Sequence, residues 1–354
     1  MDYAPAMRIR THLSIFAALS LLAAQGCGGG LQVRLVNAVT DQPSNVAMFF
    51  TVDTKDGEPV GGLAVENFAI YEDGGLVSVA ESKQTIINPE VAAEHFTLLL
   101  VDMSGSVTES DDVHLIAEAA TRFTAALSTD QRVAVYAFDG SEEIFEIQSF
   151  VRHSGEGQAR GVGRLGSFKT RDPSTNLNGA LVKAVEVTQQ AMAMSEAPLT
   201  FGTIVVFTDG TDRAARVSAR EMQRTLDRSG LEVFAIGVGS EIDEKTLSQI
   251  GLTGYVLIND IEEVVSAFEA ISERIIGMTK RFYLLSYCSP ARAGTHKVTV
   301  EVSHEGKRGS ATYEFDAAGF GPNCDPNRIP DFGDGPGVTT GGRGRSKSMR
   351  IRVE

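Results

Sequence analysis

The sequence is poor in cysteine, in histidine and in clustered positive charge. Its three cysteines, Cys27, Cys288 and Cys324, fit no zinc-binding spacing. Its six histidines are scattered and repeat no metal-ligand or catalytic-triad spacing. The formal net charge of −14 argues against a nucleic-acid partner, because such a surface would not neutralise phosphate groups. The composition therefore disfavours zinc sites, histidine-based catalysis and nucleic-acid binding.

Long apolar runs are scarce as well, and the one that stands out lies near the N-terminus. Arg8 and Arg10 precede an apolar run over residues 13–24. This run is too short to span a bilayer and has the length of a secretory signal core. We interpret residues 1–26 as a signal peptide and residues 27–32 as a glycine-rich spacer. Without the signal peptide, no transmembrane helix is expected.

The residues around Cys27 allow two interpretations. Ala24 and Gly26 stand three and one places before Cys27, as at an ordinary signal-peptidase cleavage site, which would give a secreted protein. The stretch AAQGCGGG also resembles the lipobox of bacterial lipoproteins, although Ala24 stands where that family usually has leucine. The resemblance implies lipid attachment at Cys27. It also implies a place in the bacterial cell envelope, facing the periplasm or the cell surface, with the lipid as the only membrane contact.

The other two cysteines are compatible with export. If Cys27 carries lipid, Cys288 and Cys324 are left as a pair in an oxidising compartment. A disulfide between them would close a loop of roughly 36 residues and contribute about 3 to 4 kcal/mol in the chain-entropy model. Two buried free thiols are the alternative.

Hydrophobic patterning divides the rest of the chain. Residues 33–93 show short β-rich runs separated by turn sequences such as Asp56-Gly57. Residues 94–280 alternate apolar strands with amphipathic helices. Residues 281–317 return to strands, which we expect to form a three-stranded antiparallel piece with a turn at Glu305-Gly306. Residues 318–354 are rich in glycine, proline and charge, so no fixed structure is expected there.

The alternating region predicts an α/β fold. Near-continuous apolar strands interleaved with helices indicate a mostly parallel, doubly wound sheet covered on both faces. A common strand order of such sheets is 3-2-1-4-5-6, and we take it as the expected one. A smaller β region, contributed by both chain ends, would flank it. Strands are expected at 96–101, 132–138, 144–148, 202–208, 232–238 and 255–258. Helices are expected at 113–127, 177–194, 217–228, 244–250 and 261–278.

Oxygen-bearing side chains follow two of these strands. The sequence DMSGS places Asp102 at the carboxyl end of the first strand, with Ser104 and Ser106 directly after it. Asp209 stands at the same end of the fourth strand. In the order 3-2-1-4-5-6 these strands are neighbours at the point where the winding reverses, which is where ligands bind in such sheets. Both carboxylates are therefore expected in one crevice.

A third contribution comes from the stretch DPSTNLNG. It places Ser174, Thr175 and Asn176 directly before a helix, near the same edge of the sheet. Taken alone, Ser174 or Thr175 would be interpreted as a helix N-cap. Together with the two aspartate loops, the same residues read as part of one site.

These motifs resemble the metal-ion-dependent adhesion site of von Willebrand factor type A domains. The positions that match the family's motif are Asp102, Ser104, Ser106, Thr175 and Asp209. The resemblance covers about residues 94–280 and implies that these five residues bind a metal. It also implies an open coordination position, which an Asp or Glu of a partner protein completes. Hydroxyl and carboxylate oxygens suit Mg²⁺, with Mn²⁺ or Ca²⁺ as alternatives, and do not suit zinc or copper.

The sequence also departs from the family's pattern. Family loops often have glycines before the threonine, whereas this chain has Asp172-Pro173-Ser174. Asp111 and Asp112 are interpreted as first-turn carboxylates of a helix rather than as an adjacent metal site. Asp139 and Asp212 are expected near the same face, where they add negative potential without being ligands.

Three functions fit these observations. The favoured one is an exported binding module that captures an acidic side chain of a partner protein through its metal. The second is a structural envelope protein in which the metal only joins three loops. The third is a metal-dependent hydrolase, which needs a base or nucleophile beside the metal. Because the histidines are scattered and no G-x-S-x-G motif is present, we expect no enzymatic activity.

Overall fold

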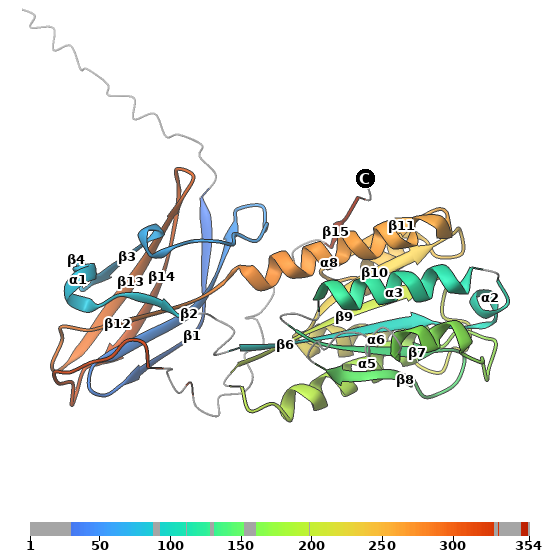
Figure 1. Cartoon of the computed structure of the whole chain (residues 1–354), viewed down its shortest axis with the longest axis horizontal. Coiled ribbons are helices and arrows are strands. Elements are labelled where there is room, and N and C mark those ends of the chain that lie inside the picture. The colour runs from blue at the N-terminus through green and yellow to red at the C-terminus, as the bar shows by residue number, and fades with distance from the viewer. Residues whose placement is uncertain are drawn as a thin grey trace, which may run out of the picture.

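The computed structural model describes residues 30–87, 93–110, 112–127, 131–151, 161–197, 199–328, 332 and 348–352. They form a β-sandwich lobe and an α/β lobe, which lie end to end (Figure 1). The expected signal peptide and Cys27 lie outside the described residues. Within the described residues, no helix has both the length and the apolar character that crossing a bilayer requires.

The α/β lobe is built on one mixed sheet. Its strands are ordered β15-β11-β10-β9-β6-β7-β8. All neighbours pair in parallel except β7 and β8, which are antiparallel. The expected order 3-2-1-4-5-6 is confirmed, with β15 added at one edge. The strands are β6 (Ala93–Asp102), β7 (Arg132–Phe138), β8 (Phe145–Val151), β9 (Leu199–Thr208), β10 (Glu232–Val238), β11 (Gly254–Ile258) and β15 (Met349–Arg350).

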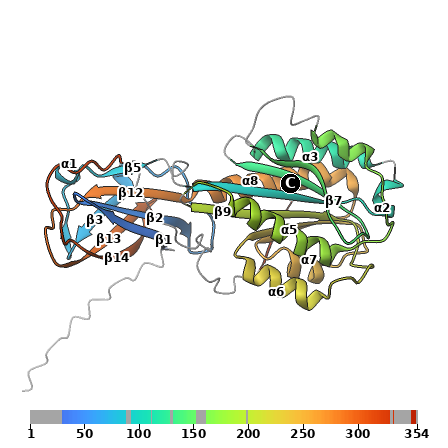
Figure 2. The same cartoon turned by 90° about the horizontal axis from the view of Figure 1, so that it is seen from below.

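Helices cover both faces of this sheet (Figure 2). Successive side chains of β6 point to opposite faces, so Leu99 and Val101 pack in the core under α3 and α8. Leu98 and Leu100 pack in the core under α5, α6 and α7. Burial on both faces explains the continuous apolar strands of the sequence. The helical segments are α2 (Gly105–Thr108), α3 (Val113–Leu127), η3 (Gly163–Ser167), α5 (Leu177–Ala193), α6 (Ala219–Ser229), α7 (Glu244–Ile250), η4 (Ile261–Glu263) and α8 (Val264–Lys280).

The second lobe is a sandwich of two four-stranded sheets. One has the order β1-β2-β12-β5 and the other the order β14-β13-β3-β4. Strands from before and after the α/β lobe therefore share one core. The elements are β1 (Leu31–Asp41), β2 (Asn45–Thr54), η1 (Val65–Asn67), β3 (Phe68–Glu72), β4 (Gly75–Leu76), α1 (Val79–Ser82), β5 (Thr85–Ile87), β12 (Phe282–Cys288), β13 (Thr295–His304) and β14 (Lys307–Asp316).

The expected three-stranded piece over residues 281–317 is wrong in one respect. β13 and β14 form the expected hairpin, with a turn through Glu305 and Gly306. β12, however, pairs with β2 and β5 in the other sheet. The physical reason is burial on both faces: Leu285 and Tyr287 enter the sandwich core, whereas Leu284 enters a second cluster. Such a strand belongs in the middle of a sheet between two cores.

An aromatic cluster joins the two lobes. Phe49 of β2, Phe201 of β9 and Phe282 of β12 pack together, and the ring centroids of Phe201 and Phe282 are 4.5 Å apart. His95 of β6 packs on the same rings, with centroid distances of 5.1 Å to Phe201 and 5.5 Å to Phe282. The cluster is buried from both lobes, which favours a fixed arrangement of the two.

The C-terminal part of the chain is more ordered than expected. Cys288 and Cys324 form a disulfide with a Cα separation of 5.8 Å. Phe320 is buried in the sandwich core, Phe332 is buried at the lobe junction, and β15 pairs with β11. The expectation that residues 318–354 lack fixed structure is therefore wrong for 318–328, 332 and 348–352. Apolar side chains in this stretch bury surface that its average composition does not reveal.

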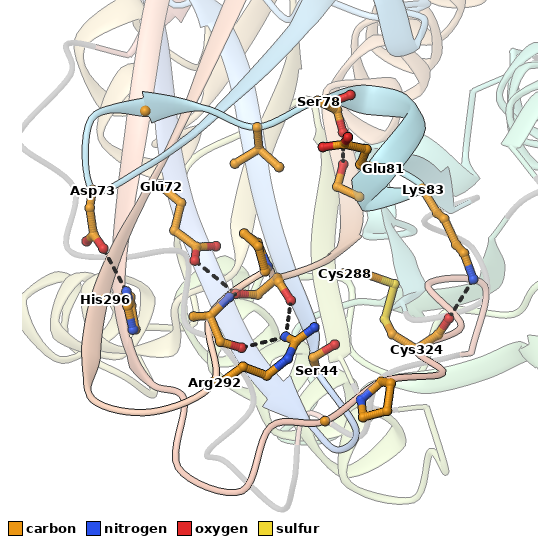
Figure 3. A pocket seen from close by; sticks show the side chains of 18 of the residues that line it. Ser44, Glu72, Asp73, Ser78, Glu81, Lys83, Cys288, Arg292, His296 and Cys324 are labelled. Carbon is orange, nitrogen blue, oxygen red and sulfur yellow. Dashed lines mark hydrogen bonds and ion pairs between the residues drawn. A yellow bond between two sulfur atoms is a disulfide. The ribbon is translucent and has the colours of Figure 1, made fainter.

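The disulfide borders a cavity at one end of the sandwich (Figure 3). The cavity has a volume of about 720 Å³, and its wall includes β4, α1 and the chain around Cys324. Lys83 donates a hydrogen bond to the Cys324 carbonyl (3.1 Å), and Asp73 is paired with His296 (2.6 Å). The disulfide and these polar contacts hold this wall of the cavity in place.

Candidate functional site

Asp102 and Asp209 lie where the sequence predicts them, at the carboxyl edge of neighbouring strands. β6 ends at Asp102, and β9 ends at Thr208, directly before Asp209. The two strands pair in parallel, with Val101 opposite Phe207. Figures 1 and 2 both show α2, which follows Asp102, at the end of the α/β lobe that is remote from the sandwich. The candidate site therefore faces away from the sandwich.

The first loop is organised around the buried Asp102 carboxylate. One of its oxygens accepts a hydrogen bond from the Ser104 backbone N–H (3.0 Å), and the other accepts one from the Thr208 hydroxyl (2.7 Å). The hydroxyl oxygens of Ser104 and Ser106 are 3.3 Å apart. The alternation D-x-S-x-S thus places two hydroxyl groups together directly beyond a buried carboxylate.

The electrostatics of the pair favour a cation. Burial, reinforced by the charge of the neighbouring Asp209 carboxylate, raises the pKa of Asp102 to about 7. Burial also raises the pKa of Asp209, while hydrogen bonding by the Ser106 hydroxyl opposes the shift. One carboxylate oxygen of Asp209 is buried without a hydrogen-bond partner. A bound cation would offset the charge of these two neighbouring carboxylates and give this oxygen a partner.

The second loop brings Thr175 next to the loop that follows Asp209. Thr175 is 5% exposed, and its carbonyl accepts hydrogen bonds from the backbone N–H groups of Arg213 (2.9 Å) and Ala214 (3.0 Å). The second loop also contacts the first, because the Gly105 N–H donates to the Pro173 carbonyl (2.9 Å). All five predicted residues therefore belong to three loops that hydrogen-bond to one another at one edge of the sheet.

The residues Asp172-Pro173-Ser174, which stand where the family often has glycines, form a turn that is held by side-chain hydrogen bonds. The Asp172 carboxylate accepts hydrogen bonds from the Ser174 N–H (3.0 Å) and from Arg216 (3.1 Å). These contacts hold the pKa of Asp172 below its usual range, the backbone hydrogen bond from Ser174 being the largest cause. The turn approaches closely over Gly140, where a Cβ atom would collide with Ser174 and Asp172.

Asp139 has a larger role than the sequence indicated. It lies directly after β7, is fully buried, and accepts hydrogen bonds from the backbone N–H groups of Ser141 (2.7 Å), Arg171 (2.7 Å) and Asp172 (3.3 Å). Its carboxylate thereby fixes the start of the loop that carries Thr175. The only sequence signal for this role is its place at the carboxyl end of a strand, the same signal that identified Asp102.

Two further residues make hydrogen bonds at the start of α5. Asp212 accepts a hydrogen bond from the backbone N–H of Asn178 (3.1 Å) in the first turn of α5. Asn176, rather than Ser174 or Thr175, is the N-cap residue of α5, and its amide donates to the Ser141 carbonyl (2.8 Å). Asp112 directly precedes α3 and does not lie in its first turn, which holds no acidic residue, so the expectation of a first-turn carboxylate is wrong for Asp112; Asp111 lies outside the described residues.

The five predicted ligands offer only oxygen atoms. They comprise two carboxylates and three hydroxyl groups, which are hard oxygen ligands of the kind that Mg²⁺, Mn²⁺ and Ca²⁺ accept. Within the described residues, no three side chains of histidine, cysteine, aspartate or glutamate cluster in a way that could hold a metal. The site therefore fits a hard cation held partly by hydroxyl groups, and it does not fit a nitrogen or sulfur site for zinc.

Comparisons with solved structures returned proteins of low sequence identity. A protein described as von Willebrand factor type A from Catenulispora acidiphila is 11% identical, with 82% of this chain and 75% of that chain covered and a TM-score of 0.46. The manganese-loaded TRAP protein of Plasmodium vivax is 18% identical, with coverages of 68% and 98% and a TM-score of 0.43. Proximal thread matrix protein 1 from the mussel byssus, with a zinc-occupied MIDAS motif, is 16% identical, with coverages of 52% and 48% and a TM-score of 0.45.

The family assignment rests on sequence. No curated protein matched the chain. The model of the von Willebrand factor type A domain family matches residues 98–271, which include β6, β9 and all three loops of the candidate site. The strand order and the helices on both faces of the sheet agree with that match. Residues 98–271 of this chain are a von Willebrand factor type A domain.

Proposed function

We propose that this chain is an exported binding module that captures an acidic side chain of a partner protein through a divalent cation, most simply Mg²⁺. The observation that carries the proposal is the convergence of three loops at the carboxyl edge of the sheet. They bring the buried Asp102 carboxylate, the partly buried Asp209 carboxylate and three hydroxyl-bearing residues to the place where such sheets bind ligands. Asp102, Ser104, Ser106, Thr175 and Asp209 would hold the ion.

The composition of this set supports a docking role for the ion. Three of the five ligands are neutral hydroxyl groups, so the set neutralises the ion's charge without adding excess negative charge. When bound, the cation would supply an electrophilic centre for a carboxylate oxygen from outside. An Asp or Glu of the partner is the group that such a centre attracts.

The placement of the site also supports docking. It lies at the end of the molecule remote from the β-sandwich, and the N-terminal strand β1 belongs to the sandwich (Figure 1). If the chain is lipid-anchored at Cys27, the sandwich would act as a spacer between a membrane and the site. The Cys288–Cys324 disulfide is in keeping with an oxidising compartment outside the cytoplasm.

A purely structural metal is the second candidate, and the loop contacts disfavour it. The three loops are already joined by direct hydrogen bonds, from Gly105 N–H to the Pro173 carbonyl and from the N–H groups of Arg213 and Ala214 to the Thr175 carbonyl. Asp139, directly after β7, adds two hydrogen bonds that hold the loop carrying Thr175. Because these contacts hold the loops together without an ion, a metal is not needed to join them.

The first test is metal binding. Mg²⁺ at a hundred times its dissociation constant should stabilise the wild-type chain by about 2.7 kcal/mol if only the folded state binds it. Asp209→Asn should abolish this shift, since the variant replaces a charged ligand by a neutral amide of the same shape. Asp212→Asn is the matched control on the same loop and should retain it. A wild-type melting temperature that does not respond to Mg²⁺, Mn²⁺ or Ca²⁺ would refute the site.

The second test separates docking from a structural role. We expect affinity capture from bacterial envelope extracts to retain a partner with Mg²⁺ and to release it with a chelator. The Asp209→Asn chain should capture nothing, whereas the Asp212→Asn chain should capture the same partner. If metal stabilises the wild-type chain but no capture depends on it, the structural role is correct instead.

A further inference from the structure

The α/β sheet ends at one side in a strand from the extreme C-terminus. β15 consists of two residues and pairs in parallel with β11, with Met349 opposite Gly254 and Arg350 opposite Tyr255. Residues 333–347, which precede it, lie outside the described residues and include six glycines. A short, extended segment that is distant in sequence thus covers the edge of β11.

Four contacts fix this segment, and each comes from a different group. The Ile351 N–H donates to the Tyr255 carbonyl (2.8 Å), and the Ile351 side chain packs against the core beneath α8. Arg350 pairs with Glu244 of α7 (3.2 Å), which also accepts a hydrogen bond from the Tyr255 hydroxyl (2.8 Å). The Ser348 hydroxyl donates to the Gly251 carbonyl.

Gly254 makes room for this segment. A Cβ atom at this position would lie 3.1 Å from the Ile351 side chain and 3.3 Å from the Met349 carbonyl oxygen. A side chain there would therefore press against the segment at two points. The absence of a side chain gives the edge of β11 a shape that matches an added strand with an aliphatic residue at the position of Ile351.

The two edges of the sheet differ in their intrinsic protection. At the other edge, β8 runs antiparallel to β7 and its register is broken by irregularities, a feature that hinders pairing with a further strand. β11 pairs regularly with β10 over Phe234–Val238, with no bulge. Without the C-terminal segment, β11 would present a straight row of unpaired backbone groups, which is a template for an added strand.

We propose that the edge of β11 is a docking site for an extended peptide and that residues 348–352 are its resident ligand. The peptide that fits has a hydroxyl residue, any residue, an arginine and an aliphatic residue in succession. Backbone pairing supplies part of the affinity, while Glu244, the Gly251 carbonyl and the apolar gap beside Gly254 supply the specificity. The site is separate from the three metal loops, so it does not rest on the proposed function.

The segment can act as a separable ligand because little of it belongs to the sheet. Only two residues are paired along the strand, and Arg350 is exposed outside its contact with Glu244. Nothing in the four contacts requires the covalent link through residues 333–347. A peptide with the same pattern can therefore take its place, whether free or offered by another chain.

The test uses a chain that ends at Lys347 and a fluorescent peptide of residues 348–352 with blocked ends. We expect the peptide to bind the shortened chain and to bind the full-length chain at least tenfold more weakly, because its own segment occupies the edge there. A peptide with Ile351→Asp should lose at least tenfold in affinity for the shortened chain. Equal binding of the two peptides, or no binding of either, would overturn the proposal.

A second pair of variants covers the case in which the shortened chain does not fold. Full-length Ile351→Asp should release its own segment and bind the wild-type peptide, whereas Arg352→Asp, one residue further on, should still exclude it. Adding Glu244→Gln to the Ile351→Asp chain should weaken peptide binding several-fold through loss of the arginine contact. If Ile351→Asp and Arg352→Asp exclude the peptide equally, the segment is not what occupies the site, and the proposal fails.

Discussion

Asp139 shows that a single carboxylate outside the predicted ligand set can determine whether that set assembles. It is buried and accepts three backbone hydrogen bonds, two of them from Arg171 and Asp172 in the loop that carries Thr175. Asp139→Asn replaces a charged acceptor by an amide that faces the same donors. We expect the free energy of unfolding to fall by about 2 to 3 kcal/mol and the affinity for Mg²⁺ to weaken. Denaturant unfolding, with and without Mg²⁺, measures both effects.

The control for Asp139 is Asp212→Asn, which alters a single contact to the Asn178 N–H. We expect this variant to lose clearly less stability and to keep its response to Mg²⁺. If the two variants lose equal stability, or if Asp139→Asn keeps the full metal response, then Asp139 does not position the Thr175 loop.

At the residue scale, the site residues that could be predicted are those that directly follow a strand in the sequence. Asp102, Ser104 and Ser106 follow one strand, and Asp209 follows its neighbour, so the strand order alone brings them together. The role of Asp139 was not predictable, because it depends on backbone N–H groups about thirty residues further along the chain. A carboxylate that accepts hydrogen bonds from a distant loop leaves no pattern in the sequence beyond its place at the end of a strand.

The helix α8 is the element that ties the sheet to the junction between the lobes. Its fully buried Phe268 packs on Phe123 of α3 and Phe207 of β9, with ring centroids 5.6 and 5.9 Å away. Phe268→Ala would leave a cavity among three elements, and we expect it to lower the free energy of unfolding by about 3 to 5 kcal/mol. Denaturant unfolding provides the measurement, with Phe268→Leu as an intermediate case.

Met194 offers the matched control for this prediction. It follows α5 and is 85% exposed, so Met194→Ala should change stability by less than about 0.5 kcal/mol. If Phe268→Ala is as mild as Met194→Ala, the core between α3 and α8 collapses around the missing ring instead of retaining a cavity.

At the element scale, the spacing of apolar residues predicted most of the α/β lobe but did not predict which sheet β12 joins. The central strands of that lobe occur where the apolar pattern predicts them, because they are buried on both faces. β12 has a similar continuous apolar pattern, yet it follows α8 and precedes a hairpin. Whether it joins the hairpin or β2 depends on Phe49 and Phe201 from distant parts of the chain, which local sequence does not specify.

At the scale of the whole molecule, Arg281 links the two lobes. It lies between α8 and β12, and its guanidinium pairs with Asp53 of β2 (3.2 Å) and Glu232 of β10 (3.7 Å). Asp53 belongs to the sandwich and Glu232 to the α/β lobe. Burial nevertheless raises the pKa of Asp53, with Arg281 opposing the shift. One cation thus offsets carboxylates from both lobes beside the aromatic cluster, which supports a fixed arrangement.

The same junction predicts a dependence of stability on pH. Burial, together with the charge of the nearby Arg281, lowers the pKa of His95 to about 4. The unfolded chain, with a histidine pKa near 6.5, therefore binds a proton before the folded chain does. Stability from this residue is fully present above about pH 6.5 and is lost as the pH falls toward 4. We expect His95→Gln to reduce the acid-induced loss of unfolding free energy by about 2 to 3 kcal/mol, measured by denaturant unfolding from pH 7 to pH 4.

His296 provides a control of the opposite sign. The Ala293 carbonyl and the Asp73 carboxylate raise its pKa, so it stabilises the fold at low pH and loses that contribution as the pH rises through its folded pKa. His296→Gln should therefore destabilise the chain more at pH 5 than at pH 8, whereas His95→Gln should do the reverse. If both variants change the pH profile in the same direction, the His95 ring is not held neutral at the junction, and the two lobes are not packed closely enough there to exclude a proton.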